Sequence, residues 1–172
     1  MIEVKRSKLK QDLLILFLSN MEKEFYMREL EKITGHLVGN IQADMKKFMN
    51  EGLFTKRKDS NRIYYKINES FPYLDEIRRD LVVFSKPKQI FKSVPDFFKA
   101  LKAVYVRPAK EKVPPYDLII VGEKSRDDVE IKISKLKEWS GQHWRYSYLN
   151  MHDIGYSIIK ADQNTSLVWE KN

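Results

Sequence analysis

The sequence contains no cysteine and only three histidines among its 172 residues. Without cysteine the chain can form neither a disulfide nor a thiolate zinc site. The three histidines, His36, His143 and His152, are not paired at the spacing of metal ligands. We therefore expect a protein with no metal ion and no cofactor.

Long apolar segments are also missing. The longest unbroken apolar run, residues 13–18, has six residues, whereas a helix needs roughly 20 to cross a bilayer. The first eleven residues, MIEVKRSKLKQ, lack the apolar core of a signal peptide. These absences predict a cytoplasmic protein with no membrane partner.

What the chain has is ordinary globular composition with an excess of basic residues. It is 42% apolar and 33% charged, with a net charge of +8. Residues 1–68 carry 14 Lys and Arg against 9 Asp and Glu. A basic excess of this size favours polyanionic partners such as nucleic acid, although many proteins with the same charge bind none.

The first 68 residues contain three helical patterns. A helix is predicted over residues 8–19, a second over 27–35 with Gly35 as its stop. A third is predicted over 36–52, where Gly52 occupies the usual position of a C-terminal glycine. The apolar positions that define the three helices are, in order, Leu9, Leu13, Leu16 and Phe17; Leu30 and Ile33; Ile41, Met45, Phe48 and Met49.

A β-hairpin is predicted directly after these helices. Two β-rich segments, LFTKRK (53–58) and RIYYKIN (62–68), flank the turn residues DSN. Two short helices joined through a glycine-containing turn form a helix-turn-helix pattern, and the hairpin adds a wing. The basic residues near its tip are Lys56, Arg57, Lys58 and Arg62.

The segment MRELEKITGHLVGNIQADMKKFMNEGLFTKRKDSNRIYYKIN, residues 27–68, resembles the winged helix-turn-helix of ArsR- and MarR-like transcriptional regulators. In that family a helix, a turn and a recognition helix are followed by an EGL junction and a basic wing. Residues 51–53 supply the junction here. The resemblance implies a DNA-binding domain over residues 1–68 and double-stranded DNA as the partner.

A recognition helix reads base edges in the major groove with residues of its N-terminal half. Asn40 and Gln42 carry amides that can hydrogen-bond adenine bidentately, unless they are merely solvated helix positions. The expected phosphate contacts are Arg28, Lys46, Arg57, Lys58 and Arg62. Asp44 would repel phosphate if it faced the groove, so we expect it to turn back toward Lys46 or Lys47.

Residues 69–92 are predicted to connect two domains. Apolar residues at helical spacing indicate a helix over residues 70–84, and residues 85–93 read as a polar break. The stripe consists of Leu74, Ile77, Leu81 and Phe84. Such a stripe packs either on its own domain or on a second copy related by two-fold symmetry, and the sequence leaves a homodimer open.

Residues 93–172 alternate helical and strand patterns, which predicts a small α/β domain with a mixed sheet in a protein that is α+β as a whole. A helix is expected from Pro95 through residue 101. Strands are expected over 103–106, 116–122 and 143–149. Residues 125–141 are predicted to form an amphipathic helix, and the C-terminal 22 residues one or two short helices.

This half resembles the minimal nucleotidyltransferase domain, on the segments PYDLIIVGE and YSYLNMHDIGYS. In that family a strand ends in Gly-Ser and a later strand begins Asp-x-Asp, whose carboxylates bind two magnesium ions. Here Arg107-Pro108 stands at the Gly-Ser position and Pro115 at the first carboxylate, so only Asp117 remains. One carboxylate cannot assemble a two-metal site. The resemblance implies a degenerate domain that is not an enzyme, with Asp117 as a relic.

Around this position the chain is strongly basic. Residues 86–112 hold eight Lys and Arg against Asp96 and Glu111. Arg107, Lys110 and Lys112 are candidates to bind an anion, a nucleotide without turnover or flanking DNA; a solvated lysine-rich surface is the alternative.

The leading hypothesis is a sequence-specific DNA-binding regulator whose second domain senses or scaffolds, with a nucleotide or a protein as effector. Two alternatives remain open. One is an active nucleotidyltransferase, for which the required carboxylates are missing. The other is a protein-binding module, such as an antitoxin that occupies a partner's active site, which no feature of the sequence excludes.

Overall fold

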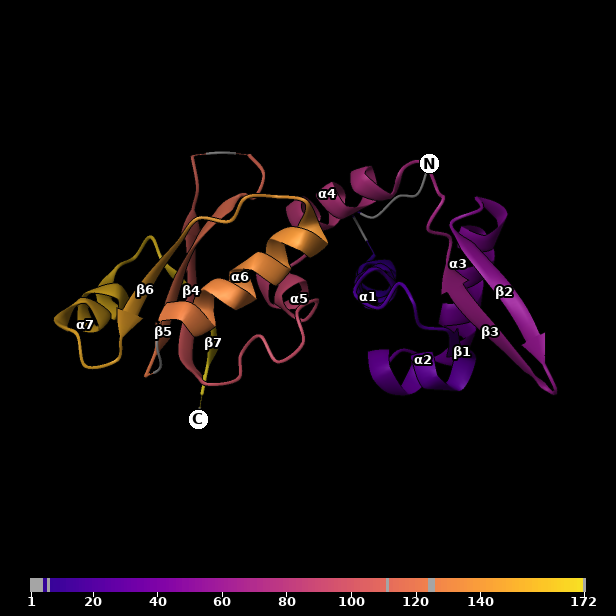
Figure 1. Ribbon diagram of the computed structural model, residues 1–172, viewed down its shortest axis with the longest axis horizontal. Helices are drawn as coiled ribbons and strands as arrows, with labels where there is room; N and C mark the ends of the chain where they lie inside the picture. Colours follow the sequence, from indigo (N-terminus) through magenta and orange to yellow (C-terminus); the bar gives the residue numbers. More distant parts are fainter. Residues whose placement is uncertain (1–4, 6, 111, 124–125, 172) are drawn as a thin grey trace. The chain divides into compact units, whose positions relative to one another are not determined.

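The computed structural model describes residues 5, 7–110, 112–123 and 126–171, with only the backbone for Ile154 and Tyr156. Four expectations touch undescribed positions: residues 1–4 and 6 of the N-terminal segment, Glu111 of the basic stretch, Ser125 at a predicted helix start, and Asn172 of the C-terminal segment. The described chain is α+β, as expected, with seven helices and two sheets. It divides into two compact units, Met1–Ser85 and Lys86–Asn172 (Figure 1).

The first unit confirms the predicted helices and hairpin and adds a short strand that the sequence had not indicated. Its described elements are, in chain order, α1 (Lys8–Leu18), β1 (Phe25–Tyr26), α2 (Met27–Thr34), α3 (Val38–Asn50), β2 (Phe54–Asp59), β3 (Arg62–Ile67) and α4 (Leu74–Phe84). The three strands form one antiparallel sheet in the order β1-β3-β2. The added strand β1 pairs with β3 and forms one edge of the sheet.

An aromatic cluster holds the helices of this unit against the sheet. The ring of Phe17 in α1 meets Phe25 and Phe54 edge-on, with centroids 5.1 and 4.5 Å apart. Phe48 of α3 lies 5.4 Å from Phe54. Burial of each such side chain contributes about 1.5–3 kcal/mol relative to exposure. The prediction that Ile33 supplies an apolar face is wrong, because its side chain is 51% exposed.

Local signals set the ends of α2, α3 and the hairpin. Gly35 ends α2 in the left-handed conformation, at φ 71°, which glycine adopts without steric cost. Gly52 follows α3 at φ 80°, as its position in the sequence predicted. The hairpin pairs Asp59 with Arg62, so two residues form its turn, and Ser60 there has φ 53°.

The apolar stripe of α4 is buried in the chain. Leu74, Ile77 and Leu81 are at most 8% exposed, whereas Phe84 is partly exposed. The side-chain amide of Gln11 in α1 donates to the carbonyl oxygen of Phe84 over 3.3 Å. Most of the apolar stripe that the sequence suggested for dimerisation is thus buried within a single copy of the chain.

The second unit is built on a four-stranded mixed sheet in the order β6-β5-β4-β7. Its described elements are, in chain order, α5 (Pro87–Phe91), β4 (Leu101–Pro108), β5 (Tyr116–Gly122), α6 (Arg126–Ser140), β6 (Tyr146–Asn150), α7 (Ile154–Ala161) and β7 (Ser166–Glu170). Only β5 and β6 are parallel, and α6 connects them across one face of the sheet (Figure 1). Consecutive residues of β4 and β5 are buried, so both faces of these central strands are covered.

Two predictions before β4 are wrong. The expected polar break at residues 85–93 contains α5, because Ile90 and Phe91 are buried and pack in the core of the unit. The expected helix from Pro95 is absent from this fully described segment, which forms successive turns. Asp96 and Ala100 adopt φ values of 56° and 65°, which a right-handed helix cannot accommodate.

The predicted strands are found with changed bounds, except β5, which matches residues 116–122. The strand expected at 103–106 is longer, and the one expected at 143–149 starts three residues later. Of the C-terminal helices expected, only α7 forms. Residues 166–170 instead pair with the edge of β4 as β7, a pairing between distant segments that local pattern does not indicate. Within the described residues no helix is long and apolar enough to cross a membrane.

Candidate nucleic-acid interface

The exposed side of α3 is a stripe of small and polar residues. Gly39, Ala43 and Lys46 are exposed and follow one another along the middle of the stripe at the spacing of successive turns. Asn40 and Gln42 are exposed at its two edges, about 160° apart around the helix axis at 3.6 residues per turn. The small residues Gly39 and Ala43 permit another molecule to approach the helix closely. The amides of Asn40 and Gln42 lie on either side of them.

Asp44 turns away from this stripe, as predicted. Its side chain is buried, and one carboxylate oxygen lies 3.5 Å from the Nζ of Lys47 in the same helix. The negative charge is thereby withdrawn from the exposed side of α3. Asp44 therefore places no exposed carboxylate beside Lys46 in the stripe.

The two faces of the hairpin carry different basic residues. Successive side chains of a strand point to opposite faces, and Phe54 on one face of β2 packs against α1 and α3. Lys56 and Lys58 follow at intervals of two, so they share the face that turns toward the helices. Both are exposed. We call them the inner-face lysines.

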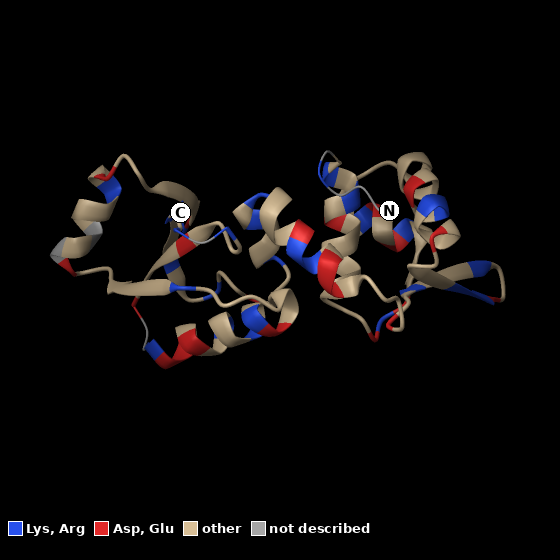
Figure 2. Ribbon diagram, turned by 90° about the horizontal axis from the view of Figure 1, so that it is seen from above, with Lys and Arg blue, Asp and Glu red and all other residues tan. Residues whose placement is uncertain are grey.

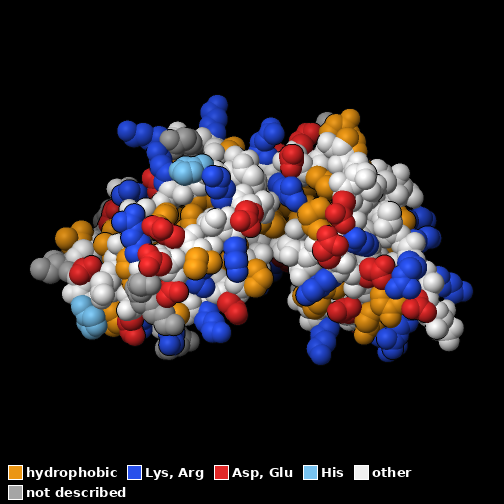
Figure 3. Space-filling view, in the orientation of Figure 1, with side chains coloured by type: hydrophobic (Ala, Val, Ile, Leu, Met, Phe, Trp, Pro, Cys, Tyr) orange, Lys and Arg blue, Asp and Glu red, His pale blue; other side chains and the backbone are white. Residues whose placement is uncertain are grey.

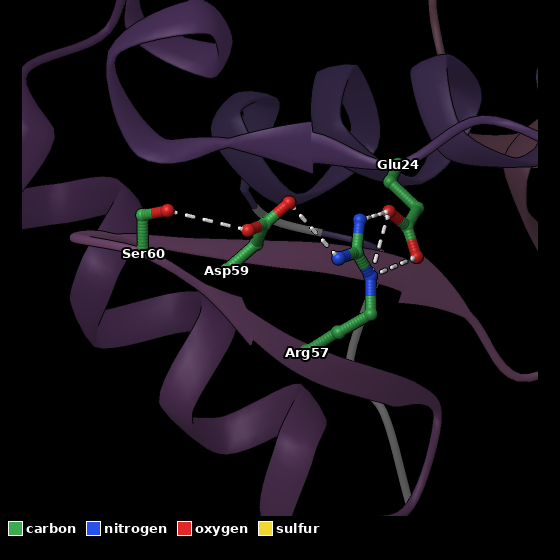
Figure 4. A network of polar contacts seen from close by, with 4 residues as sticks. All are labelled: Glu24, Arg57, Asp59 and Ser60. Atoms are coloured by element: carbon green, nitrogen blue, oxygen red, sulfur yellow. Dashed lines mark hydrogen bonds and ion pairs between the residues drawn. The ribbon is translucent and has the colours of Figure 1, made fainter.

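Arg57 lies on the opposite, outer face, where it joins a polar network with two carboxylates (Figure 4). Its Nη2 donates to the Oε2 of Glu24 over 2.6 Å and its Nη1 to Asp59 over 3.3 Å. The hydrogen bond from Arg57 lowers the pKa of Glu24, and these carboxylates raise the pKa of the guanidinium. The guanidinium of Arg57, which the sequence suggested as a phosphate contact, is therefore paired with two carboxylates.

Aromatic rings complete the outer face. The guanidinium of Arg57 lies 5.2 Å from the ring centroid of Tyr64, and that of Arg62 lies 5.0 Å from the ring of Tyr26. The two tyrosines meet edge-on at 5.8 Å. Cations stacked on rings in this way hold the strands β1, β3 and β2 together across the sheet.

Two exposed apolar residues that the sequence did not suggest as DNA contacts lie at or before the start of α3. Leu37, which caps the N-terminus of α3, is 72% exposed, and Ile33 is exposed in the preceding helix. An apolar side chain at this end of a recognition helix can contact the methyl group of thymine. The sequence could not identify these two residues as candidate contacts, because an apolar residue in a helical pattern is equally expected on a buried helix face. Arg28 is exposed at the start of α2, as expected.

Charge is distributed over both units. Basic residues run along the hairpin toward its tip (Figure 2). On the side of the molecule seen in Figure 3, acidic and hydrophobic side chains interrupt the basic ones in each unit. Net charge therefore does not define an interface by itself, whereas the exposed residues of α3 and the inner-face lysines form a distinct surface.

In the second unit, Asp117 is held by two arginines at the start of β5. Its Oδ1 accepts a hydrogen bond from the Nε of Arg145 over 2.9 Å, and its Oδ2 lies 3.7 Å from the Nε of Arg107. The carboxylate is only 18% exposed. A cation at Asp117 would have to displace guanidinium groups from both oxygens. No cluster of three potential metal ligands occurs among the described residues.

An open hollow of about 540 Å³ adjoins this carboxylate. Of the three candidate anion-binding residues, Arg107 and Lys110 line it, together with Arg145, which the sequence had not offered. Lys112 is exposed in the loop between β4 and β5 and is not among the lining residues. Cations thus outnumber the single carboxylate around this hollow.

Comparison of the chain with protein-family models, with curated proteins and with solved structures found no significant match.

Proposed function

We propose that the protein is a cytoplasmic, sequence-specific DNA-binding regulator whose first unit is a winged helix-turn-helix. The supporting observation is the element order α1-β1-α2-α3-β2-β3 with a sheet ordered β1-β3-β2. In this arrangement the exposed stripe of α3 adjoins a hairpin that carries exposed lysines on its inner face. A helix in the major groove with a basic hairpin beside it has the parts that duplex recognition requires.

In this proposal α3 enters the major groove along the line of Gly39, Ala43 and Lys46. Asn40 and Gln42 then face the two walls of the groove, where their amides read base edges. Lys46, Arg28 and the inner-face lysines neutralise phosphates. Arg57 instead positions the hairpin through its carboxylate network, and Arg62 supports the outer face through Tyr26.

The proposal gives the second unit a sensing or scaffolding role without catalysis, on the fold of a degenerate nucleotidyltransferase. The engagement of Asp117 by Arg107 and Arg145 supports this role, because the carboxylate already has cationic partners. The hollow beside it is suited to an anion. Magnesium-dependent transfer of label from ATP that Asp117→Ala abolishes would contradict the proposal.

A homodimer is compatible with this proposal, since regulators that bind two half-sites are two-fold symmetric. The stripe of α4 is buried within the chain, so pairing would use other exposed side chains. Sedimentation of the full chain with and without duplex would establish whether two copies bind one site.

Lys46→Ala tests the interface on α3, with the exposed Lys23 outside it as a matched control. Loss of one phosphate contact reduces the slope of log affinity against log salt by about 1 and weakens binding to every duplex alike. Fluorescence anisotropy on duplex from the upstream region should show this loss for Lys46→Ala and no change for Lys23→Ala. Equal effects of the two variants would exclude α3 as the interface.

A further inference from the structure

A second hollow in the Lys86–Asn172 unit lies at the ends of the two parallel strands. It has a volume of about 330 Å³, within the lower range of small-molecule sites. β5 ends at Gly122 and β6 at Asn150, and these two residues are paired in the parallel register. In open α/β sheets, ligands bind beyond the carboxyl ends of parallel strands.

Three lysines surround this hollow, which we call the lysine cleft. Lys132 and Lys135 extend from α6, and Lys99 from the turns before β4. The Nζ of Lys132 donates to the carbonyl oxygen of Asp96 over 2.6 Å. Within the described chain, neither Lys99 nor Lys135 has a carboxylate at ion-pair distance. Asp96 and Asp128 also line the hollow, so three ammonium groups there accompany two carboxylates.

The electrostatics of the cleft favour an added anion. Burial lowers the pKa of Lys132, and the nearby charges of Lys135 and Lys99 lower it further, against the opposite effect of Asp96 and Asp128. Mutual repulsion of the three cations is relieved when an anion is placed among them. The pKa of Lys132 stays below its ordinary value chiefly because of burial, and the three ammonium groups that line the cleft exceed its two carboxylates by one charge.

The backbone around the cleft is held in uncommon conformations. Asp96 and Ala100 have positive φ values, and together they bracket the turn that presents Lys99. A non-glycine residue in the left-handed region is strained, and such strain concentrates at functional sites. Opposite this turn, a Cβ added to Gly122 would lie 3.4 Å from the hydroxyl oxygen of Tyr148. The strand end and the phenol thus meet closely at the cleft.

We propose that the lysine cleft binds the phosphate group of a small phosphorylated ligand through Lys99, Lys132 and Lys135. A phosphate ester carries a charge of about −1.5 to −2 and three acceptor oxygens, which matches three ammonium donors. Tyr148 also lines the cleft, near the end of the strand pair. Val94, Leu101 and Val129 supply an apolar wall for the rest of the ligand.

Titration of the full chain with inorganic phosphate, followed by amide NMR, tests this site. Saturable shifts are expected at Gly122 and Tyr148. Lys99→Gln and Lys135→Gln should each weaken phosphate binding about tenfold, as expected when one charge-assisted hydrogen bond is lost. Lys137→Gln is the matched control, because Lys137 is exposed on the same helix but does not line the cleft.

The same variants distinguish a free phosphate compound from the phosphates of nucleic acid. The inference does not depend on DNA binding by the first unit, so Lys99→Gln and Lys135→Gln should leave the affinity for duplex unchanged. Absence of saturable shifts would overturn the site, as would an equal loss in Lys137→Gln. Weaker duplex binding with unchanged phosphate binding would overturn the small-ligand assignment.

Discussion

The indole of Trp144 illustrates how a single polar contact stabilises the core of the second unit. Trp144 is 2% exposed, and its Nε1 donates to the Oγ of Ser140 over 2.9 Å. The same hydroxyl donates to the carbonyl oxygen of Leu136 over 2.7 Å. A buried donor that loses its acceptor incurs its full desolvation cost. Ser140 therefore allows a tryptophan to be buried completely.

Ser140→Ala should lower the free energy of unfolding by about 1–3 kcal/mol, because the Trp144 N–H would remain buried without this acceptor. Urea denaturation followed by tryptophan fluorescence measures the change. Ser134→Ala is the control, since Ser134 is exposed on the same helix and should shift stability by less than about 0.5 kcal/mol. Equal effects of the two substitutions would show that the hydroxyl is dispensable.

At the scale of elements, we propose that the inner face of the β2–β3 hairpin binds DNA and that its outer face positions the hairpin. We expect Lys56→Gln with Lys58→Gln to weaken duplex binding and to reduce the salt slope by about 2, one for each lost phosphate contact. Arg57→Gln should leave the slope nearly unchanged, because Glu24 and Asp59 already engage the guanidinium. Fluorescence anisotropy across a salt series measures the slopes of the unmodified protein, the double lysine variant and Arg57→Gln. A larger loss for Arg57→Gln than for the lysine pair would reverse the assignment of faces.

The network on the outer face should also respond to pH. The hydrogen bond from Arg57 lowers the pKa of Glu24 below its ordinary value of 4.5. The stabilisation is thus complete above that value and is lost as the pH falls through the lower folded pKa. Carboxyl ¹³C shifts should titrate below 4.5 in the native protein and move up toward it in Arg57→Gln. An unchanged midpoint in the variant would show that Arg57 does not set this pKa.

Elements with local signals could be predicted from the sequence, and elements formed by distant pairing could not. Apolar spacing and terminal glycines identified α1, α2 and α3, and β5 matched its predicted bounds. β7 could not be predicted, because its strand character comes from pairing with β4. Residues 95–101 were predicted as a helix, since the positive φ values at Asp96 and Ala100 leave no trace in residue type.

The same limit applies to the candidate site. Asn40 and Gln42 were expected as amides in the N-terminal half of the helix, and the turn of Asp44 away from the exposed side was expected because its charge would repel phosphate. Which face of the hairpin carries each basic residue required the strand register. The partnership of Arg145 with Asp117 joins residues 28 positions apart, and no local pattern indicates it.

At the scale of the whole molecule, the division at Ser85 separates the proposed DNA contacts from the second unit. A fragment of residues 1–85 should fold, because compact units with their own core can fold independently. It should bind duplex with the salt slope of the full chain, roughly −4 for the four proposed phosphate contacts. A markedly smaller slope for the fragment would mean that the second unit also contacts DNA.

The most direct test of the central claim is the affinity of the full chain for duplex from its own upstream region and for scrambled duplex, measured by anisotropy across a salt series. The account predicts a preference for the native duplex of at least about 4 kcal/mol, the low end for specific binders. We also expect a linear slope of roughly −4. Equal, weak and salt-sensitive binding to both duplexes would contradict sequence-specific regulation and leave only a basic surface.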